Sequence, residues 1–192
     1  ALASVALMNV GVAYRILGDY DEAIKQFQRA KSHFEEVGDL ARLAEVHYKL
    51  GATLLTKRAY VDALHEFETS DLYSANVNNR MLNGLACLGK ANATFHLGDL
   101  RMAVTLADQA LDYFSIQDDR VYVAEVYRLK GTIHREMRKL EFAHWYLYTS
   151  LKINLDLENA YNVGDCYYEL GKLHALRRNH NDAKKAFRKS VE

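Results

Sequence analysis

The sequence repeats itself at a step of 40 residues, and no other feature constrains its fold as strongly. One position of the repeat holds a small residue, at Gly11, Gly51, Ala91, Gly131 and Gly171. A second position is always alanine, at Ala23, Ala63, Ala103, Ala143 and Ala183. Copies that stay in register without a gap predict a stack of similar units, each of which packs against its neighbours.

Each unit is predicted to be a pair of helices. Ala23, Phe27 and Ala30 lie at i, i+4 and i+7, which is one face of a helix. The chain contains no proline, and this favours long uninterrupted helices. We expect the first helix of each pair at residues 3–17, 40–57, 80–97, 120–137 and 160–177. We expect the second helix at residues 20–37, 60–76, 100–116, 140–156 and 180–192.

Residues that cap helices precede most of these segments. The residues expected to cap first helices are Asp39, Asn79, Asp119 and Asn159, and those expected to cap second helices are Asp19, Asp99 and Asn179. Their side chains can accept hydrogen bonds from the unpaired N–H groups of the first helical turn. Ala59 and Lys139 hold the same position without a suitable side chain, so those two turns need another solution.

This pattern resembles the tetratricopeptide repeat family. The signature of that family stands here as Val10, Gly11, Tyr14, Ala23, Phe27 and Ala30, and again as Leu50, Gly51, Leu54, Ala63, Phe67 and Ser70. The resemblance covers the whole chain and implies an all-α, right-handed superhelical solenoid of about five helix-turn-helix repeats. The period is longer than the family's usual length of about 34 residues, and the usual closing proline is missing. Both departures resemble a long-repeat variant found in cell-polarity adaptors of the Leu-Gly-Asn type and in bacterial regulators.

The domain organisation is predicted to be a single array over residues 1–192, because no break in composition divides the chain. The repeats are expected at about residues 1–38, 39–78, 79–118, 119–158 and 159–192. The sequence starts at Ala1 rather than at methionine, from which we expect a fragment of a longer protein.

Composition argues against several classes of partner. Lys+Arg and Asp+Glu both number 25, and a neutral chain is not held on nucleic acid by bulk electrostatics. No apolar run approaches the ~20 residues of a membrane span, and the first residues lack the basic start of a signal peptide. Cys87 and Cys166 are too few and too far apart for a disulfide framework. We therefore expect a cytoplasmic protein with neither a nucleic-acid nor a membrane partner.

The sequence offers no recognisable catalytic chemistry. It lacks a glycine-rich phosphate loop, a nucleophile elbow and a local signature around either cysteine. His134 and His174 share one repeat position, but no acidic ligand set accompanies them, so they are expected to pack between helices. The basic C-terminal segment lacks interleaved aromatic residues and is expected to be a solvated helix. We predict no catalytic residue, no metal site and no cofactor.

The family resemblance implies that the first helices of the pairs line a concave wall, which binds an extended peptide or a partner's helix. The positions carried over in the second unit are Glu45, Tyr48, Lys49, Ala52 and Leu55, and those in the third are Leu85, Leu88, Gly89, Asn92 and Phe95. From the whole wall, the candidate partner-binding residues are Tyr48, Leu55, Leu88, Asn92, Phe95, Arg128, Arg135, Tyr168 and Lys172.

The character of these candidates changes along the chain. The early units offer apolar and aromatic side chains and the last two offer charged ones, which predicts a partner segment with apolar residues and an acidic end. The family's Lys, Asn and Arg clamp for chaperone termini is not expected, because its positions hold Met8, Val12, Ala52 and Leu88, with only Asn92 fitting.

Plainer interpretations remain open for the same residues. Val5 and Met8 are expected to pack against a repeat beyond this segment. Arg128 can pair with Glu125 on its own helix or with Asp165 on the next, which is the usual outcome for such charges. The sequence pattern is equally compatible with a groove position and a core position for Tyr48, Leu55, Leu88 and Phe95.

Two functional hypotheses follow. The first is a non-enzymatic module that binds a peptide or helix of a partner protein. The alternative is the sensor arm of a signalling or transcription regulator, which binds a small peptide or effector and switches an attached domain. The presence of an effector domain in the same gene would distinguish the second from the first.

Overall fold

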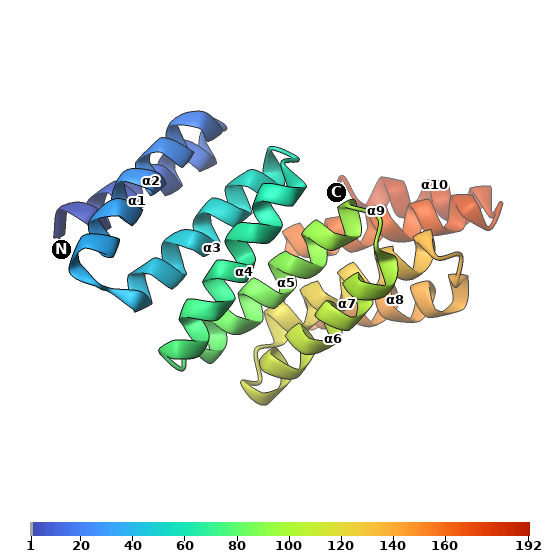
Figure 1. Ribbon diagram of the computed structural model, residues 1–192. Helices are drawn as coiled ribbons and strands as arrows, with labels where there is room; N and C mark the ends of the chain where they lie inside the picture. The colour runs from blue at the N-terminus through green and yellow to red at the C-terminus, as the bar shows by residue number, and fades with distance from the viewer. Residues whose placement is uncertain (1) are drawn as a thin grey trace. The chain divides into compact units, whose positions relative to one another are not determined.

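A computed structural model describes residues 2–192, which fold into helices joined by short turns (Figure 1). The first helices of the pairs are α1 (Leu2–Ile16), α3 (Leu40–Thr56), α5 (Arg80–His96), α7 (Arg120–Glu136) and α9 (Ala160–Leu176). The second helices are α2 (Tyr20–Val37), α4 (Tyr60–Asn76), α6 (Leu100–Ile116), α8 (Leu140–Asp156) and α10 (His180–Lys189). The predicted all-α class with five helix pairs is confirmed, and only the end of α10 differs from its expected position by more than one residue.

The chain divides into two compact units, and the division falls between Tyr113 and Phe114 in the sequence of α6. In the first unit α1 contacts α3 and α3 contacts α5, so the first helices of successive pairs are neighbours. The second unit repeats this arrangement with α7 and α9. Within residues 2–192, none of the helices has both the length and the apolar character needed to cross a membrane.

The core of the first unit depends on a close contact between rings and glycine backbones. The Phe67 side chain is buried against both α3 and α5. A Cβ atom added to Gly51 would lie 2.9 Å from the ring, and one added to Gly89 would lie 2.5 Å from it. Both distances are shorter than van der Waals contact, so these positions require glycine if the ring is to keep its place. Ala63, one turn before Phe67 on α4, is fully buried beside it.

The predicted caps are present. The side chains of Asp39 and Asn79 accept hydrogen bonds from the backbone N–H groups of Arg42 and Leu82. The same bond forms at Asp19, Asp99, Asp119, Asn159 and Asn179. The helices α4 and α8 begin at Ala59 and Lys139 without a side-chain cap.

The turns before α4 and α8, which lack a capping side chain, have a left-handed residue at the same position as the capped turns before α2 and α6. Arg58 and Arg138 take left-handed conformations with φ of 63° and 60°, where Gly18 and Gly98 stand in other repeats. A left-handed conformation is unfavourable for a residue with a side chain. Arg178 takes the same conformation before the capping residue Asn179, so the left-handed residue does not replace a cap. At Ala59 and Lys139 the first N–H groups of α4 and α8 have no side-chain acceptor from the capping position.

Replacing Lys139 with aspartate should stabilise the protein. Lys139 has φ of −86° and ψ of 67°, close to the values of the capping residue Asp119, so Asp fits there without strain. The Lys139→Asp change supplies the missing acceptor and removes a positive charge from the positive end of the helix. We expect a gain of about 1 kcal/mol in the free energy of unfolding, measured by urea denaturation. As a matched control, Asp119→Ala should lose about the same amount. A Lys139→Asp protein no more stable than the wild type would contradict this account of the turn.

Candidate functional site

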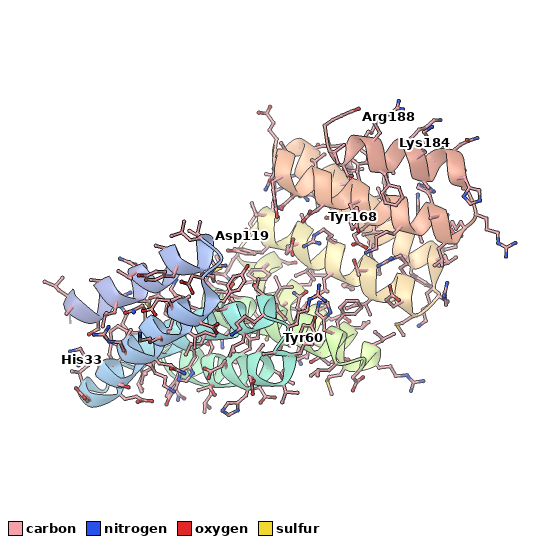
Figure 2. The ribbon with its side chains drawn as sticks, turned by 90° about the horizontal axis from the view of Figure 1, so that it is seen from above. His33, Tyr60, Asp119, Tyr168, Lys184 and Arg188 are labelled. Atoms are coloured by element: carbon pink, nitrogen blue, oxygen red, sulfur yellow. The ribbon has the colours of Figure 1, made fainter. Side chains whose placement is uncertain are left out.

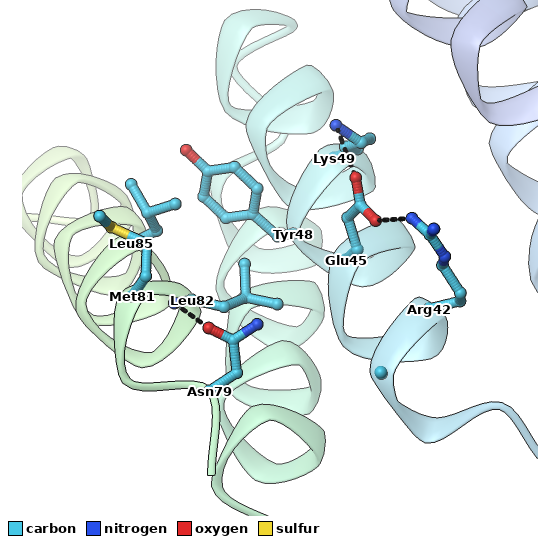
Figure 3. A pocket seen from close by; sticks show the side chains of 9 residues that line it. Arg42, Glu45, Tyr48, Lys49, Asn79, Met81, Leu82 and Leu85 are labelled. Carbon is cyan, nitrogen blue, oxygen red and sulfur yellow. Dashed lines mark hydrogen bonds and ion pairs between the residues drawn. The ribbon is translucent and has the colours of Figure 1, made fainter. Parts of the chain in front are cut away.

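A groove opens between α3 and α5 in the first unit, with a cavity volume of about 370 Å³ (Figure 3). We call it the α3–α5 groove. It is lined by Ala41, Arg42, Glu45, Tyr48, Lys49, Asn79, Met81, Leu82 and Leu85.

The apolar part of the α3–α5 groove comes from both helices. Figure 3 shows Tyr48 of α3 opposite Met81, Leu82 and Leu85 of α5. The Tyr48 ring centroid lies 5.9 Å from that of Phe67, so the core supports the ring from behind. Leu82 is buried, whereas Met81, Leu85 and Tyr48 are half-buried and offer apolar surface to a ligand.

One rim of the groove carries three charged side chains of α3. Arg42 donates from Nη1 to Oε2 of Glu45 over 2.8 Å. Lys49 Nζ lies 3.3 Å from the other carboxylate oxygen of Glu45. Two cations thus share one carboxylate, and the rim keeps a surplus of one positive charge. Beside the apolar wall, this rim can attract an acidic group of a ligand.

The other candidates of the first unit lie outside this groove. Leu55 packs with Tyr48 against the core around α4. Leu88 is only 7% exposed and offers little surface. Asn92 donates from Nδ2 to the Leu88 carbonyl over 3.1 Å, a bond within its own helix. Phe95 is half-buried near the end of α5. Of the aromatic and apolar candidates in this unit, the structure brings Tyr48 alone into the groove.

In the second unit Arg128 follows the plainer interpretation. Its Nη2 donates to Oε1 of Glu125 over 2.5 Å, and its Nη1 lies 3.9 Å from Oδ2 of Asp165. The guanidinium therefore joins α7 to α9 through the two carboxylates foreseen as its alternative partners.

Arg135, Tyr168 and Lys172 gather around Glu169. Arg135 Nη2 lies 3.0 Å from Oε2 of Glu169, and Lys172 Nζ lies 2.9 Å from Oε1. The Lys172 ammonium also lies 4.9 Å from the Tyr168 ring centroid. Arg135 and Glu169 are 9% and 8% exposed. Arg135 Nε and Glu169 Oε2 are buried without a well-directed hydrogen bond, so the contact is an ion pair held mainly by charge.

Sequence reasoning found part of the α3–α5 groove and missed part. It placed Glu45, Tyr48, Lys49 and Leu85 on this wall. It missed Arg42, Met81 and Leu82, which lie in the first turn of each helix. Arg42 lies three residues before Glu45 and Met81 lies four before Leu85, so helical periodicity was the signal that could have found both.

The thiols stand in surroundings that suppress their chemistry. Burial raises the pKa of Cys87 to about 11. Burial likewise raises the pKa of Cys166, which packs beside Ser150 and Asn154. Among residues 2–192 there is no group of three or more His, Cys, Asp or Glu side chains placed to hold a metal ion.

Models of the tetratricopeptide repeat match the chain at two places, residues 2–70 and 159–192. A search of curated proteins gives no match.

Several solved structures share the fold. One is the Rap conjugation gene regulator of the plasmid pLS20 in complex with the Phr* peptide, with a TM-score of 0.84 and 15% identity over 96% of this chain. Another is aspartyl phosphate phosphatase F from Bacillus subtilis, with a TM-score of 0.79 and 13% identity over 98% of this chain. A third is a signal transduction ATPase from Pyrococcus horikoshii that carries a tetratricopeptide repeat sensor, with a TM-score of 0.81 and 16% identity over 97% of this chain.

Because the sequence identities to these three structures are only 13–16%, the similarity shows a shared fold and nothing about shared function. The chain spans 51% of the first of these proteins, 59% of the second and 28% of the third.

The ion pair between Arg135 and Glu169 can be tested by a double-mutant cycle. Glu169→Leu removes the buried carboxylate and leaves the Arg135 guanidinium with the half-exposed Glu136, 3.1 Å away, as its remaining carboxylate partner. We expect a loss of about 3 kcal/mol in the free energy of unfolding, because the buried part of the cation then faces an apolar side chain. Arg135→Met combined with Glu169→Leu should recover most of that loss, because no buried charge is then left unpaired. Denaturant unfolding of the wild type, both single variants and the double variant measures the coupling. If the two losses simply add, the pair does not hold α7 to α9, and Arg135 is available to a ligand.

The two thiols should be nearly inert in the folded protein. With a pKa of about 11, only about one Cys87 side chain in a thousand is ionised at pH 8, and the thiolate is the reactive form. We expect slow reaction with a thiol-specific chromogenic reagent in buffer and rapid reaction of both cysteines in guanidinium chloride. A Cys87→Ser variant assigns the remaining signal to Cys166. Rapid modification of the native protein at either position would contradict the burial described above.

Proposed function

Since the chain carries tetratricopeptide repeats, we propose that it is a non-enzymatic module that binds a peptide or helix of a partner protein in the α3–α5 groove. The observation that carries this proposal is the pairing of an apolar wall, formed by Tyr48 and Leu85, with a charged rim on the same helix as Tyr48. Grooves that bind peptides commonly combine apolar pockets with a few polar groups that fix the orientation.

The size of the groove suits one or two side chains of a ligand. An apolar side chain of the partner packs between Tyr48, Met81 and Leu85, and burying it fully contributes roughly 1.5–3 kcal/mol. A neighbouring acidic residue pairs with the surplus cation shared by Arg42 and Lys49. The partner segment is therefore an apolar residue next to an acidic one, and the acidic end is bound in the first unit.

In the second unit we propose Tyr168 and Lys172 as further contacts. Tyr168 is 50% exposed, and the Lys172 ammonium over its ring adds charge to an aromatic surface. Arg128 and Arg135 have carboxylate partners on α7 and α9, so we give them the role of holding these helices in register. Leu55, Leu88, Asn92 and Phe95 support the wall from within and at its edge.

A peptide ligand is compatible with what is known of the fold. A solved structure with the same fold contains the Phr* peptide, which supports the proposal without identifying the ligand of this chain. We further propose that the five helix pairs act as one array in the cytoplasm, a reducing compartment in which Cys87 and Cys166 stay unpaired.

A sensor arm is the second candidate. It is favoured by the structure from Pyrococcus horikoshii, in which a tetratricopeptide repeat sensor is part of a larger signalling ATPase. Both candidates use the same groove, and they differ in what is attached to it. In the sensor, ligand binding changes the activity of an effector domain in the same polypeptide; in the interaction module it does not.

The α3–α5 groove can be tested with selected peptides. Random peptides displayed on phage are selected on the immobilised protein, and the strongest binder is synthesised and measured by fluorescence anisotropy. Leu85→Glu places a charge in the apolar wall, and we expect it to weaken binding at least about tenfold, a change of about 1.4 kcal/mol. Leu72→Glu is the matched control, because Leu72 is 62% exposed on α4 and lies outside the groove.

Circular dichroism first establishes that both variants are folded. Equal binding by the wild type and Leu85→Glu, or a selection that yields no binder, would contradict the groove. Hydrolysis of an aspartyl phosphate by the purified protein would contradict the non-enzymatic part of the proposal.

A further inference from the structure

A second groove lies in the second unit, between α8 and α10 and above α9, with a cavity volume of about 320 Å³. We call it the α8–α10 groove. Its residues on α9, Tyr167, Leu170 and His174, follow helical spacing and occupy a different face of that helix from Tyr168 and Lys172. It is therefore distinct from every surface assigned above.

The floor of the α8–α10 groove is apolar and its wall is aromatic. Leu151, Leu170 and Ala186 form the floor and are buried. Tyr148 stands on the α8 side and is 58% exposed, although its ring stacks on His144 at 6.1 Å and 10°. An exposed ring held in place by a neighbouring ring provides a preformed surface for an apolar ligand group.

The α10 side of the groove is positively charged. Lys189 Nζ lies 5.1 Å from the Tyr167 ring centroid, and Lys185 Nζ lies 3.8 Å from Oδ1 of Asp182. Asp182 also accepts a hydrogen bond from Asn179 Nδ2 over 2.6 Å, so its carboxylate is shared. Its pairing with Lys185 is long and leaves that ammonium accessible to another carboxylate.

The rest of α10 strengthens the same field. Lys184 and Arg188 are exposed on the neighbouring face of α10, where Figure 2 labels both. The helix therefore carries four cations and one carboxylate, in a chain whose formal net charge is zero. Such a local excess of one sign attracts a ligand of the opposite sign and raises its rate of association.

We propose that the α8–α10 groove binds an acidic segment of a partner protein, with an apolar side chain on the leucine floor and carboxylates on Lys185 and Lys189. This goes beyond the function proposed for the α3–α5 groove, since it uses other helices and another face. The charge complementarity of α10 and the apolar floor select the ligand together: neither acidic residues alone nor an apolar peptide alone satisfies both.

A single-stranded nucleic acid fits the groove less well. Its binding relies on many phosphate contacts and on free aromatic faces for stacking. The groove itself offers two cations, Lys185 and Lys189, and its tyrosine rings already lie beside His144 and the Lys189 ammonium. A peptide backbone, by contrast, has N–H groups that can donate hydrogen bonds to the Asp182 carboxylate.

His174 gives the groove a dependence on pH. Burial lowers its pKa; Asp182 of α10 acts in the opposite direction, while His144 of α8 and Arg177 lower it further. His174 is therefore neutral at pH 7.5. The cations that line the groove are Lys185 and Lys189. A bound carboxylate favours the protonated ring, so binding takes up a proton and tightens as the pH falls from about 7.5 to about 6. The glutamates of the ligand stay ionised over this range.

The test uses a fluorescein-labelled peptide of glutamates and aspartates around a central phenylalanine, titrated with the whole chain and followed by anisotropy. Lys185→Glu with Lys189→Glu reverses two charges inside the groove, and we expect at least about tenfold weaker binding, or 1.4 kcal/mol. Lys184→Glu with Arg188→Glu makes the same change in net charge on the same helix outside the groove, and we expect a loss of about threefold or less. Tyr148→Ala should weaken binding without any change in charge.

Further arms make the result decisive. A peptide with glutamine and asparagine in place of the acids should not bind. His174→Gln should reduce the pH dependence while keeping binding at pH 7.5, and His144→Gln measures the part contributed by the second histidine of the groove. Equal losses in the two charge-reversed variants would mean that only bulk charge matters and would overturn the proposal. Preferential binding of a labelled oligothymidylate, or no binding of the acidic peptide, would overturn it as well. The α3–α5 groove is also proposed to take an apolar residue beside an acidic one, so every titration is repeated in the Leu85→Glu background. Binding that persists there and is lost with Lys185→Glu and Lys189→Glu belongs to the α8–α10 groove, and failure of one groove is thereby separate from failure of the other.

Discussion

The close contact between the Phe67 ring and the backbones of two helices is the constraint on which the first unit depends. The ring fits because Gly51 and Gly89 carry no Cβ atom at the points of contact. In interiors packed to crystal-like density, such a contact fixes the distance between α3 and α5. That distance is also the width of the α3–α5 groove, so the feature that makes the repeat pack also determines what its outer face can bind.

The same contact recurs in the second unit with different residues. A Cβ atom on Gly131 would lie 2.6 Å from the Leu147 side chain, and one on Gly171 would lie 2.7 Å from Phe187. In these pairs the large apolar residue changes between Phe and Leu, while the residue it meets is glycine; the third repeat has Ala91 at the glycine position. A small residue at this position is therefore what the repeats share, and the side chain that fills the space can vary within limits of volume.

The parts of the fold that depend on local interactions could be predicted from the sequence. Helix ends follow from caps such as Asp39 and Asn79, whose hydrogen bonds join atoms three residues apart. Ion pairs between helices are harder to predict from the sequence. Arg128 has candidate partners on its own helix and on the next, and the structure shows that it contacts both. The α8–α10 groove could not be found from one segment. The C-terminal helix lacks aromatic residues on its basic face, and Tyr148 and Tyr167 come from two other helices.

The distribution of charge separates stabilising surfaces from candidate binding surfaces. Around Glu169, cations and carboxylates are matched and partly buried, and such a site loses stability if a ligand removes one partner. At Arg42 and Lys49, and more strongly on α10, cations outnumber carboxylates at the solvent surface beside an apolar floor. Surplus charge at an exposed rim costs little in the free protein, because water and salt screen it, and it becomes useful only when a ligand brings the missing carboxylate. The chain is neutral as a whole because its surplus cations are balanced elsewhere, and local imbalance next to apolar surface is therefore the better guide to where it binds.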